Sequence, residues 1–316
     1  MKKLVSLALV LVMVFAMVAC TAAPKDTYTV GVSQLVQHVA LDAATEGFQA
    51  ALKEELGDKV TIKVQNASND IPMCSTIANQ FVAENVDLIM ANATPVLQAA
   101  SAATATIPIL GTSVTEYDVA LGIKDFTGTV GGNVSGTSDL APLDQQAAMI
   151  KEWFPNAKKI GLLYCSAEAN SQYQVDVVKA EVEKMGMTAE YFSFSDSNDL
   201  AAVVESAVTT CDVIYVPTDN TVAANTGIID NICQPKKIPV IAGEEGICDG
   251  CGVATLSISY YDLGVATVKM AAKILKGEAK IAEMPIEYAP QFTKKYNPAI
   301  CEALGLTAPE GYVAIG

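Results

Sequence analysis

Arginine is absent from this sequence of 316 residues: all 20 basic residues are lysines, against 35 aspartates and glutamates. Without arginine, no guanidinium can form paired hydrogen bonds with the carboxylate or phosphate of a ligand. The net charge of −15 argues against a nucleic-acid partner, because phosphates require a basic surface. The acidic composition instead favours solubility outside the cell.

Histidine and the common catalytic motifs are also scarce. The single histidine, His38, excludes a multi-histidine zinc centre, and serine–histidine–aspartate chemistry would depend on it alone. The sequence contains neither a G-x-S-x-G nucleophile motif nor a G-x-x-x-x-G-K-[ST] phosphate loop. We therefore expect no catalytic residues, no metal and no cofactor, and we predict that the protein is not an enzyme.

The N-terminus has the pattern of an export signal. Two lysines precede an apolar run over residues 4–19, which is shorter than the roughly 20 residues that a spanning helix needs. The run ends in Met17-Val18-Ala19-Cys20, which resembles a bacterial lipobox. We expect a signal peptide over 1–19, a lipid on Cys20, and a tether over 20–27 that anchors the protein to the outer face of the membrane. The alternative is an ordinary signal peptide followed by a chance cysteine.

Eight cysteines are present, and a lipid on Cys20 would leave seven. Export permits disulfides, but an odd count leaves at least one thiol unpaired or joined to another molecule. Cys248-Asp-Gly-Cys251 is the one C-x-x-C motif, and it is compatible with a local disulfide, two free thiols or a redox pair. The pairing of the seven cysteines stays open.

From Thr27 onward, short β-rich runs alternate with helical stretches, as in the strand TYTVGVSQL (27–35) and the helix over 41–57. After the glycine-rich segment 126–139 the cycle restarts, and DLIMANATP (87–95) is echoed by DVIYVPTDN (212–220). This order predicts an α/β fold of two doubly wound, Rossmann-like lobes with parallel sheets. Polar side chains follow many of these strands, where ligands gather in open α/β sheets.

Several of these segments are similar to a known family. They are VSQLVQHVALDAATEGFQAAL, DLIMANATPVLQAASAATATIPIL, KKIGLLYCSAEANS, VIYVPTDNTV, IPVIAGEEG and ATLSISYYDLGVATVKMAAKILKG. They resemble substrate-binding lipoproteins of ABC importers, in the branch associated with tryptophan and other aromatic amino acids. The resemblance implies a type I periplasmic-binding-protein fold, a hinge that closes on a small amino acid-like ligand, and an ABC permease as partner.

The expected organisation follows. Residues 28–138 and about 258–284 would form lobe 1, and residues 139–257 and about 285–316 would form lobe 2. We expect a monomer that binds no nucleic acid. Alternatives are a receptor for a sugar or nucleoside, and a sensor that signals to a membrane protein.

An amino-acid ligand would need a buried acceptor for its ammonium, and without arginine its carboxylate would depend on hydroxyls, amides and helix N-termini. Asp219 is the first candidate for the ammonium, with a helix cap as the alternative role. Glu244 and Glu245 are second candidates, with a solvated loop as the alternative. The remaining predicted ligand-binding residues are Ser33, Gln34, Thr94, Pro95, Ser113, Tyr117, Glu168, Asn170, Ser171 and Asn220.

For the ligand side chain, the aromatic candidates near strand ends are Tyr117, Tyr173, Tyr260 and Tyr261. We interpret Trp153 as a packing residue and His38 as a residue that orders its loop, with ligand contact as the alternative for His38.

Overall fold

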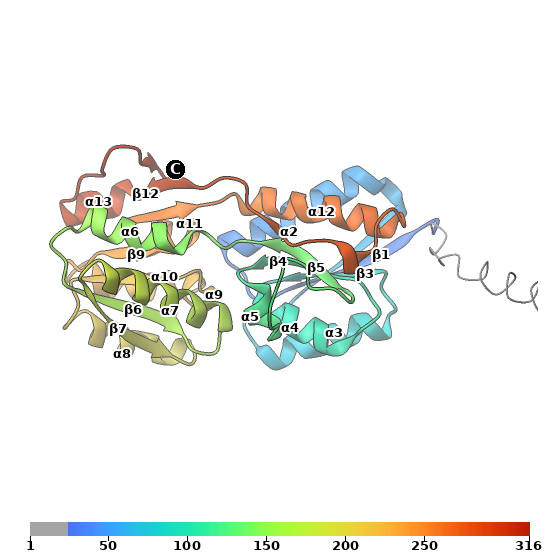
Figure 1. Ribbon diagram of the computed structural model, residues 1–316, viewed down its shortest axis with the longest axis horizontal. Helices are drawn as coiled ribbons and strands as arrows, with labels where there is room; N and C mark the ends of the chain where they lie inside the picture. Colours follow the sequence, from blue (N-terminus) through green and yellow to red (C-terminus); the bar gives the residue numbers. More distant parts are fainter. Residues whose placement is uncertain (1–24) are drawn as a thin grey trace, which may run out of the picture.

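The computed structural model describes residues 25–316, and its fold consists of two α/β lobes joined at one edge (Figure 1). The expected signal peptide and Cys20 lie outside the described residues. In the described part of the chain, no helix is long and apolar enough to cross a membrane.

Lobe 1 is built on a parallel sheet in the order β11-β5-β4-β3-β1-β2. Its strands are β1 (Tyr28–Gln34), β2 (Val60–Asn66), β3 (Leu88–Asn92), β4 (Ile109–Val114), β5 (Val134–Ser138) and β11 (Glu287–Tyr288). Its helices are α2 (Val39–Leu56), α3 (Ile71–Ala83), α4 (Thr94–Ala103), α5 (Tyr117–Leu121) and α12 (Tyr260–Leu275), with short 3₁₀ turns at Gly57–Lys59 and Ile281–Glu283. Helices α2 and α12 cover one face of the sheet, and α3 and α4 cover the other (Figure 1).

Lobe 2 repeats this plan around a sheet in the order β13-β12-β10-β9-β8-β6-β7, in which β12 runs antiparallel to β10. Its strands are β6 (Lys159–Cys165), β7 (Thr188–Phe194), β8 (Val213–Val216), β9 (Val240–Ala242), β10 (Ala254–Ser257), β12 (Thr293–Tyr296) and β13 (Val313–Ala314). Its helices are α6 (Leu143–Trp153), α7 (Ala169–Lys184), α8 (Ser197–Ala207), α9 (Asn220–Ala223), α10 (Thr226–Cys233), α11 (Glu245–Cys251) and α13 (Pro298–Leu304).

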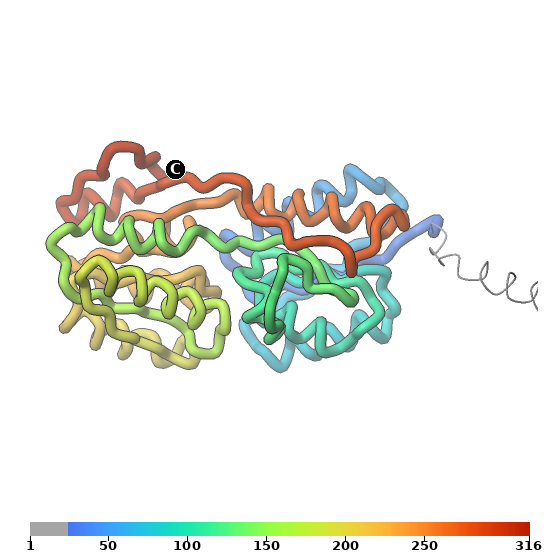
Figure 2. Tube along the Cα trace, in the orientation of Figure 1, coloured from blue at the N-terminus to red at the C-terminus, as the bar shows by residue number. Residues whose placement is uncertain are grey.

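The chain crosses between the lobes three times, and Figure 2 allows each crossing to be followed. The crossings lie between β5 and α6, between β10 and α12, and between β11 and β12. Because β11 pairs with β5, residues 287–288 belong to the sheet of lobe 1. The last crossing therefore follows Tyr288 and does not lie near residue 285. A two-residue strand is too short to leave a recognisable pattern in the sequence.

Burial explains why these segments form these elements. Strand β3 is buried at every position, as expected for a central parallel strand with helices on both faces. Helices α2 and α12 approach closely at two glycines: a Cβ on Gly47 would lie 2.2 Å from the carbonyl oxygen of Tyr261, and one on Gly264 would lie 2.1 Å from that of Ala44. This close packing fixes α12 to lobe 1, although it follows lobe 2 in the sequence.

Candidate functional site

The carboxyl ends of the strands of one lobe face those of the other. His38, after β1, lies with Nε2 3.2 Å from Oδ1 of Asn220, which begins α9 in lobe 2. Asn69, after β2, donates from Nδ2 to Oγ1 of Thr221 over 3.1 Å. These two contacts across the cleft close one end of it. His38 therefore joins the lobes, a role that sequence reasoning did not identify.

Three predicted residues of lobe 1 place hydroxyls without partners at this boundary. Ser33, Thr94 and Ser113 are at most 5% exposed, and their hydroxyl oxygens have no hydrogen-bond partner in the protein. They follow or end β1, β3 and β4, which are neighbours in the sheet, so the hydroxyls form a row. Buried polar atoms are nearly always paired, and a row of unpaired ones indicates a surface built for another molecule.

The backbone around this row is strained. Ala93 has φ = 105° and Ser113 has φ = 51°, conformations that residues other than glycine rarely adopt and that cost roughly 1–3 kcal/mol. Such strain is concentrated at functional sites. Thr94 and Pro95 form the first turn of α4, whose free N–H groups and dipole favour an anion close to the Thr94 hydroxyl.

Two other predicted residues of lobe 1 serve the fold. Gln34 accepts from Oγ1 of Thr45 over 2.6 Å and donates to Asp42, so it holds the start of α2. Tyr117 is 1% exposed, lies in the core of lobe 1, and donates its hydroxyl to the carbonyl of Thr137 over 3.0 Å. The geometry thus gives Gln34 and Tyr117 supporting roles beneath the row of hydroxyls.

In lobe 2, Asp219 adopts the alternative role of helix cap. Its Oδ1 accepts from the backbone N–H of Val222 at 2.9 Å, and its Oδ2 accepts from that of Cys165 at 2.7 Å. Burial, together with the nearby carboxylate of Glu168, raises the pKa of Asp219. With both oxygens engaged, Asp219 is poorly placed to pair with an ammonium group.

Glu168 is the hub of the same region. Its carboxylate accepts from the backbone N–H groups of Asn220 and Thr221, at 3.1 and 2.9 Å, and from both their side chains. The side chain is 2% exposed. Glu168 therefore holds the loop after β6 to the start of α9, and through Asn220 it supports the contact with His38.

Asn170, which lies in the first turn of α7, does present a free atom. Its Nδ2 donates to the carbonyl oxygen of Thr218 over 3.1 Å, which fixes the orientation of the amide. Its Oδ1 is then buried without a partner. Ser171 beside it is fully buried. Asn170 thus offers an acceptor on lobe 2, opposite the hydroxyls of lobe 1.

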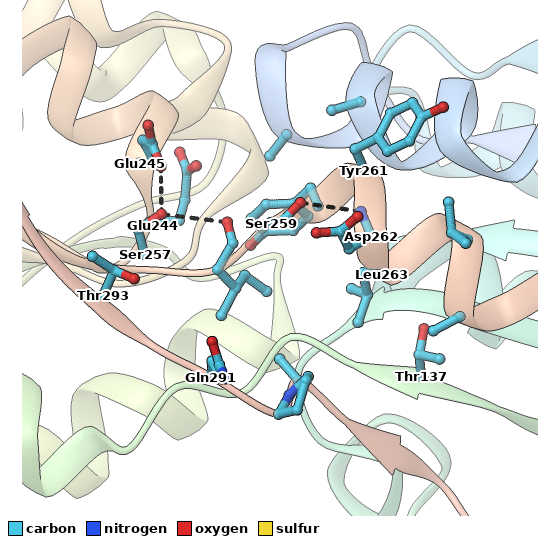
Figure 3. A pocket seen from close by; sticks show the side chains of 18 of the residues that line it. Thr137, Glu244, Glu245, Ser257, Ser259, Tyr261, Asp262, Leu263, Gln291 and Thr293 are labelled. Carbon is cyan, nitrogen blue, oxygen red and sulfur yellow. Dashed lines mark hydrogen bonds between the residues drawn. The ribbon is translucent and has the colours of Figure 1, made fainter. Parts of the chain in front are cut away.

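The last predicted pair, Glu244 and Glu245, lies elsewhere. Glu244 caps α11 through the N–H groups of Gly246 and Ile247, and burial raises its pKa to about 7. Glu245 pairs with Lys295 at 2.7 Å and accepts from the hydroxyl of Ser257. Both glutamates line a groove of about 910 Å³ beside the hinge (Figure 3).

This groove is the larger of the cavities that we described, but it is not our candidate ligand site. Its rim is exposed, since Val39, Tyr261 and Tyr288 are 70%, 42% and 48% exposed. Buried polar atoms without partners do not line it; those atoms lie between the strand ends. We assign the ligand to the strand ends because desolvated, unpaired groups require a partner and exposed ones do not.

Sequence reasoning missed Asp139, the first residue after β5. It is 4% exposed; Oδ2 accepts from the hydroxyl of Tyr260 at 3.0 Å, and Oδ1 is unpaired. Burial raises its pKa to about 6. The available signal was its position after a strand, as for Ser33 and Thr94, but it follows a glycine-rich segment that we interpreted as a linker.

The other aromatic candidates are distributed widely. Tyr260 is buried at the hinge, Tyr261 lies on the rim of the hinge groove, and Tyr173 is half-buried on α7. Trp153 packs edge-on against Tyr312 with ring centroids 5.2 Å apart, as its interpretation as a packing residue requires.

The seven cysteines of the described chain are all buried and unpaired. For Cys248 and Cys251, burial raises the pKa of both thiols, which disfavours the reactive thiolate. Of the alternatives for the C-x-x-C motif, the structure therefore shows two free thiols.

Two hinged α/β lobes that enclose unpaired polar groups define a two-lobed solute-binding protein. The chain belongs to the ABC transporter substrate-binding protein family, whose model matches residues 29–314. The predicted fold class and family are thereby confirmed. The family consists of solute-binding proteins rather than enzymes, and its members bind a small molecule outside the cytoplasm and work with an ABC permease.

Individual relatives refine this picture. The chain is 38% identical over 265 residues to a tyrosine-binding protein of Clostridioides difficile strain R20291, covering 83% of this chain and 76% of that protein. It is also similar to a crystal structure from Streptococcus pneumonia in complex with L-Trp, with 36% identity, a TM-score of 0.86, and coverage of 92% of this chain and 100% of that one.

A third relative indicates the conformation. A substrate-binding protein with adhesive properties from Clostridium difficile, in its ligand-free, open structure, is 39% identical and covers 92% of this chain and 99% of that one, but the TM-score is 0.69. The present structure thus matches the complex with L-Trp better than the open form. Its direct contacts between the lobes agree with a closed arrangement.

Proposed function

We propose that this protein binds an aromatic L-amino acid, tyrosine or tryptophan, between its two lobes and delivers it to an ABC permease. The single observation that carries the proposal is the row of unpaired hydroxyls of Ser33, Thr94 and Ser113 at the carboxyl ends of neighbouring strands. The names of the relatives, one a tyrosine-binding protein and one in complex with L-Trp, support the choice of ligand.

The ligand carboxylate would lie on lobe 1. Hydroxyls can donate to a carboxylate, and the N-terminus of α4 next to Thr94 adds a favourable dipole. This arrangement replaces the arginine that the chain lacks. Each hydroxyl would exchange water for a charged acceptor on binding, which contributes roughly 1.5–3 kcal/mol for a well-aligned bond.

Closure would follow from contacts that only the closed form allows. The ligand can shift the equilibrium between open and closed forms only through its additional contacts in the closed form. Here those contacts would be the hydroxyls of lobe 1 and Oδ1 of Asn170 on lobe 2, supplemented by the bonds of His38 and Asn69 across the cleft.

A thermal-shift screen followed by calorimetry tests the proposal. The mature chain would be mixed with each of the 20 amino acids, with glucose and ribose, and with nucleosides. Tyrosine and tryptophan should raise the unfolding temperature, because a ligand at 100 times its Kd stabilises the folded state by about 2.7 kcal/mol. A shift with a sugar or nucleoside, and none with an aromatic amino acid, would refute the proposed ligand.

We also propose that Cys20 carries the lipid anchor and that the protein acts as a monomer. The lipobox-like sequence before Cys20 supports the anchor. Cys20→Ala should abolish incorporation of labelled palmitate in a bacterial host, and incorporation that persists would contradict the assignment. Light scattering of the mature chain should give the mass of one copy.

A further inference from the structure

Asp139 is a buried carboxyl group that the interactions described so far do not explain. It lies at the start of the first crossing between the lobes, directly after β5. Its neighbour strand β4 ends at Ser113 and Val114, and its backbone N–H donates to the carbonyl of Val114. Asp139 therefore extends the row formed by Ser33, Thr94 and Ser113 by one more strand, toward the hinge.

One oxygen of Asp139 is anchored and the other is free. Oδ2 accepts from the hydroxyl of Tyr260, the first residue of α12, at 3.0 Å. Tyr260 follows the second crossing, so this bond links two of the three hinge segments. Oδ1 is buried and has no partner. The carboxyl is thus held in place with one acceptor unused.

The surroundings of Asp139 contain no compensating charge. Within residues 25–316, the titratable groups that face it are Glu244 from lobe 2, Tyr117 from α5 and Tyr260 from α12, and none of them is a cation. A buried carboxylate without a cation is costly, and the cost disappears when a cation pairs with it. A ligand that carries a positive charge would satisfy this position.

We propose that Oδ1 of Asp139 accepts a hydrogen bond from the ammonium group of the bound amino acid, and that Tyr260 is a positioning residue for that carboxylate. The inference rests on the proposed function, since the hydroxyl row binds the carboxylate of the same ligand. It places the ammonium at the hinge and transfers to Asp139 the role that the sequence suggested for Asp219. Binding then couples directly to a segment that moves when the lobes close.

The test compares amino acids with their desamino analogues. Calorimetry would measure Kd for L-tyrosine and 3-(4-hydroxyphenyl)propionate, and for L-tryptophan and indole-3-propionate. Asp139→Asn keeps an acceptor for Tyr260 but removes the charge. It should weaken binding of the two amino acids at least tenfold and leave binding of the analogues unchanged or tighter. Asp144→Asn, the same change at an exposed site in the same segment, should change neither.

The outcomes that would overturn the proposal are distinct. Equal weakening of amino acid and analogue by Asp139→Asn would show a purely structural role, and unchanged amino-acid binding would show no role. If that variant does not fold, Tyr260→Phe serves instead: it should weaken the amino acid several-fold and spare the analogue, and equal effects on both would refute the inference. Failure of the wild type to bind either amino acid would refute the proposed function itself, and with it this inference.

Discussion

Thr94 offers a direct measure of what one hydroxyl of the cleft contributes. Thr94→Val removes the hydroxyl and keeps the shape of the side chain. The hydroxyl makes no hydrogen bond within the protein, so the variant should unfold at the wild-type temperature without ligand. With ligand it would lose a hydrogen bond to a charged carboxylate, which contributes roughly 1.5–3 kcal/mol. Kd should therefore rise about 10- to 150-fold.

Isothermal titration with L-tryptophan and L-tyrosine measures this change. Thr76→Val is the matched control, because Thr76 lies exposed on α3 of the same lobe and bonds only the carbonyl of Pro72. Its Kd should equal that of the wild type. An unchanged Kd for Thr94→Val would remove Thr94 from the site, and a lower unfolding temperature without a change in affinity would show that the hydroxyl serves the fold.

Other expected outcomes follow from the same contacts. Glu168→Ala leaves four donors without their acceptor and should lower the free energy of unfolding in urea by about 2–4 kcal/mol, whereas Glu190→Ala, at an exposed ion pair, should change it little. Ligand affinity should be constant above about pH 7 and fall below about pH 6 in calorimetry. Protonation there removes the charge of Asp139, whose pKa is about 6, and charges His38, whose burial lowers its pKa and so favours the neutral ring in the closed form. Asp139→Asn should remove its own part of this fall and leave the parts due to His38 and Glu244; an identical pH profile would contradict the assignment. The seven buried thiols should react slowly with a thiol reagent in the native protein and promptly in urea, and rapid native labelling would contradict their burial.

The fold could be predicted because it is written locally in the chain. Apolar strands such as Leu88–Asn92 alternate with helices, and the polar residues after them mark the edge where the lobes meet. The hydroxyls of Ser33, Thr94 and Ser113 were predicted for the same reason, and the structure leaves them free.

The carboxylates could not be assigned in this way. An acidic residue between a strand and a helix can cap that helix or bind a ligand, and the two roles have the same sequence pattern. Asp219 and Glu244 use both oxygens for caps. Asp139 precedes no helix directly, so it lacks the pattern that drew attention to the others. Its free oxygen is a property of the packing of three segments that are distant in the sequence.

The position of α12 has a consequence for how each half of the molecule can be handled. Val268, Met270 and Leu275 fill the same core as Phe48 and Leu52 of α2, yet they are encoded after most of the other half. A fragment that stops at Ser138 would carry α2 with this apolar surface uncovered and would aggregate when expressed alone. Neither half is a continuous piece of chain, so a soluble single half requires splicing residues 260–288 onto the N-terminal part.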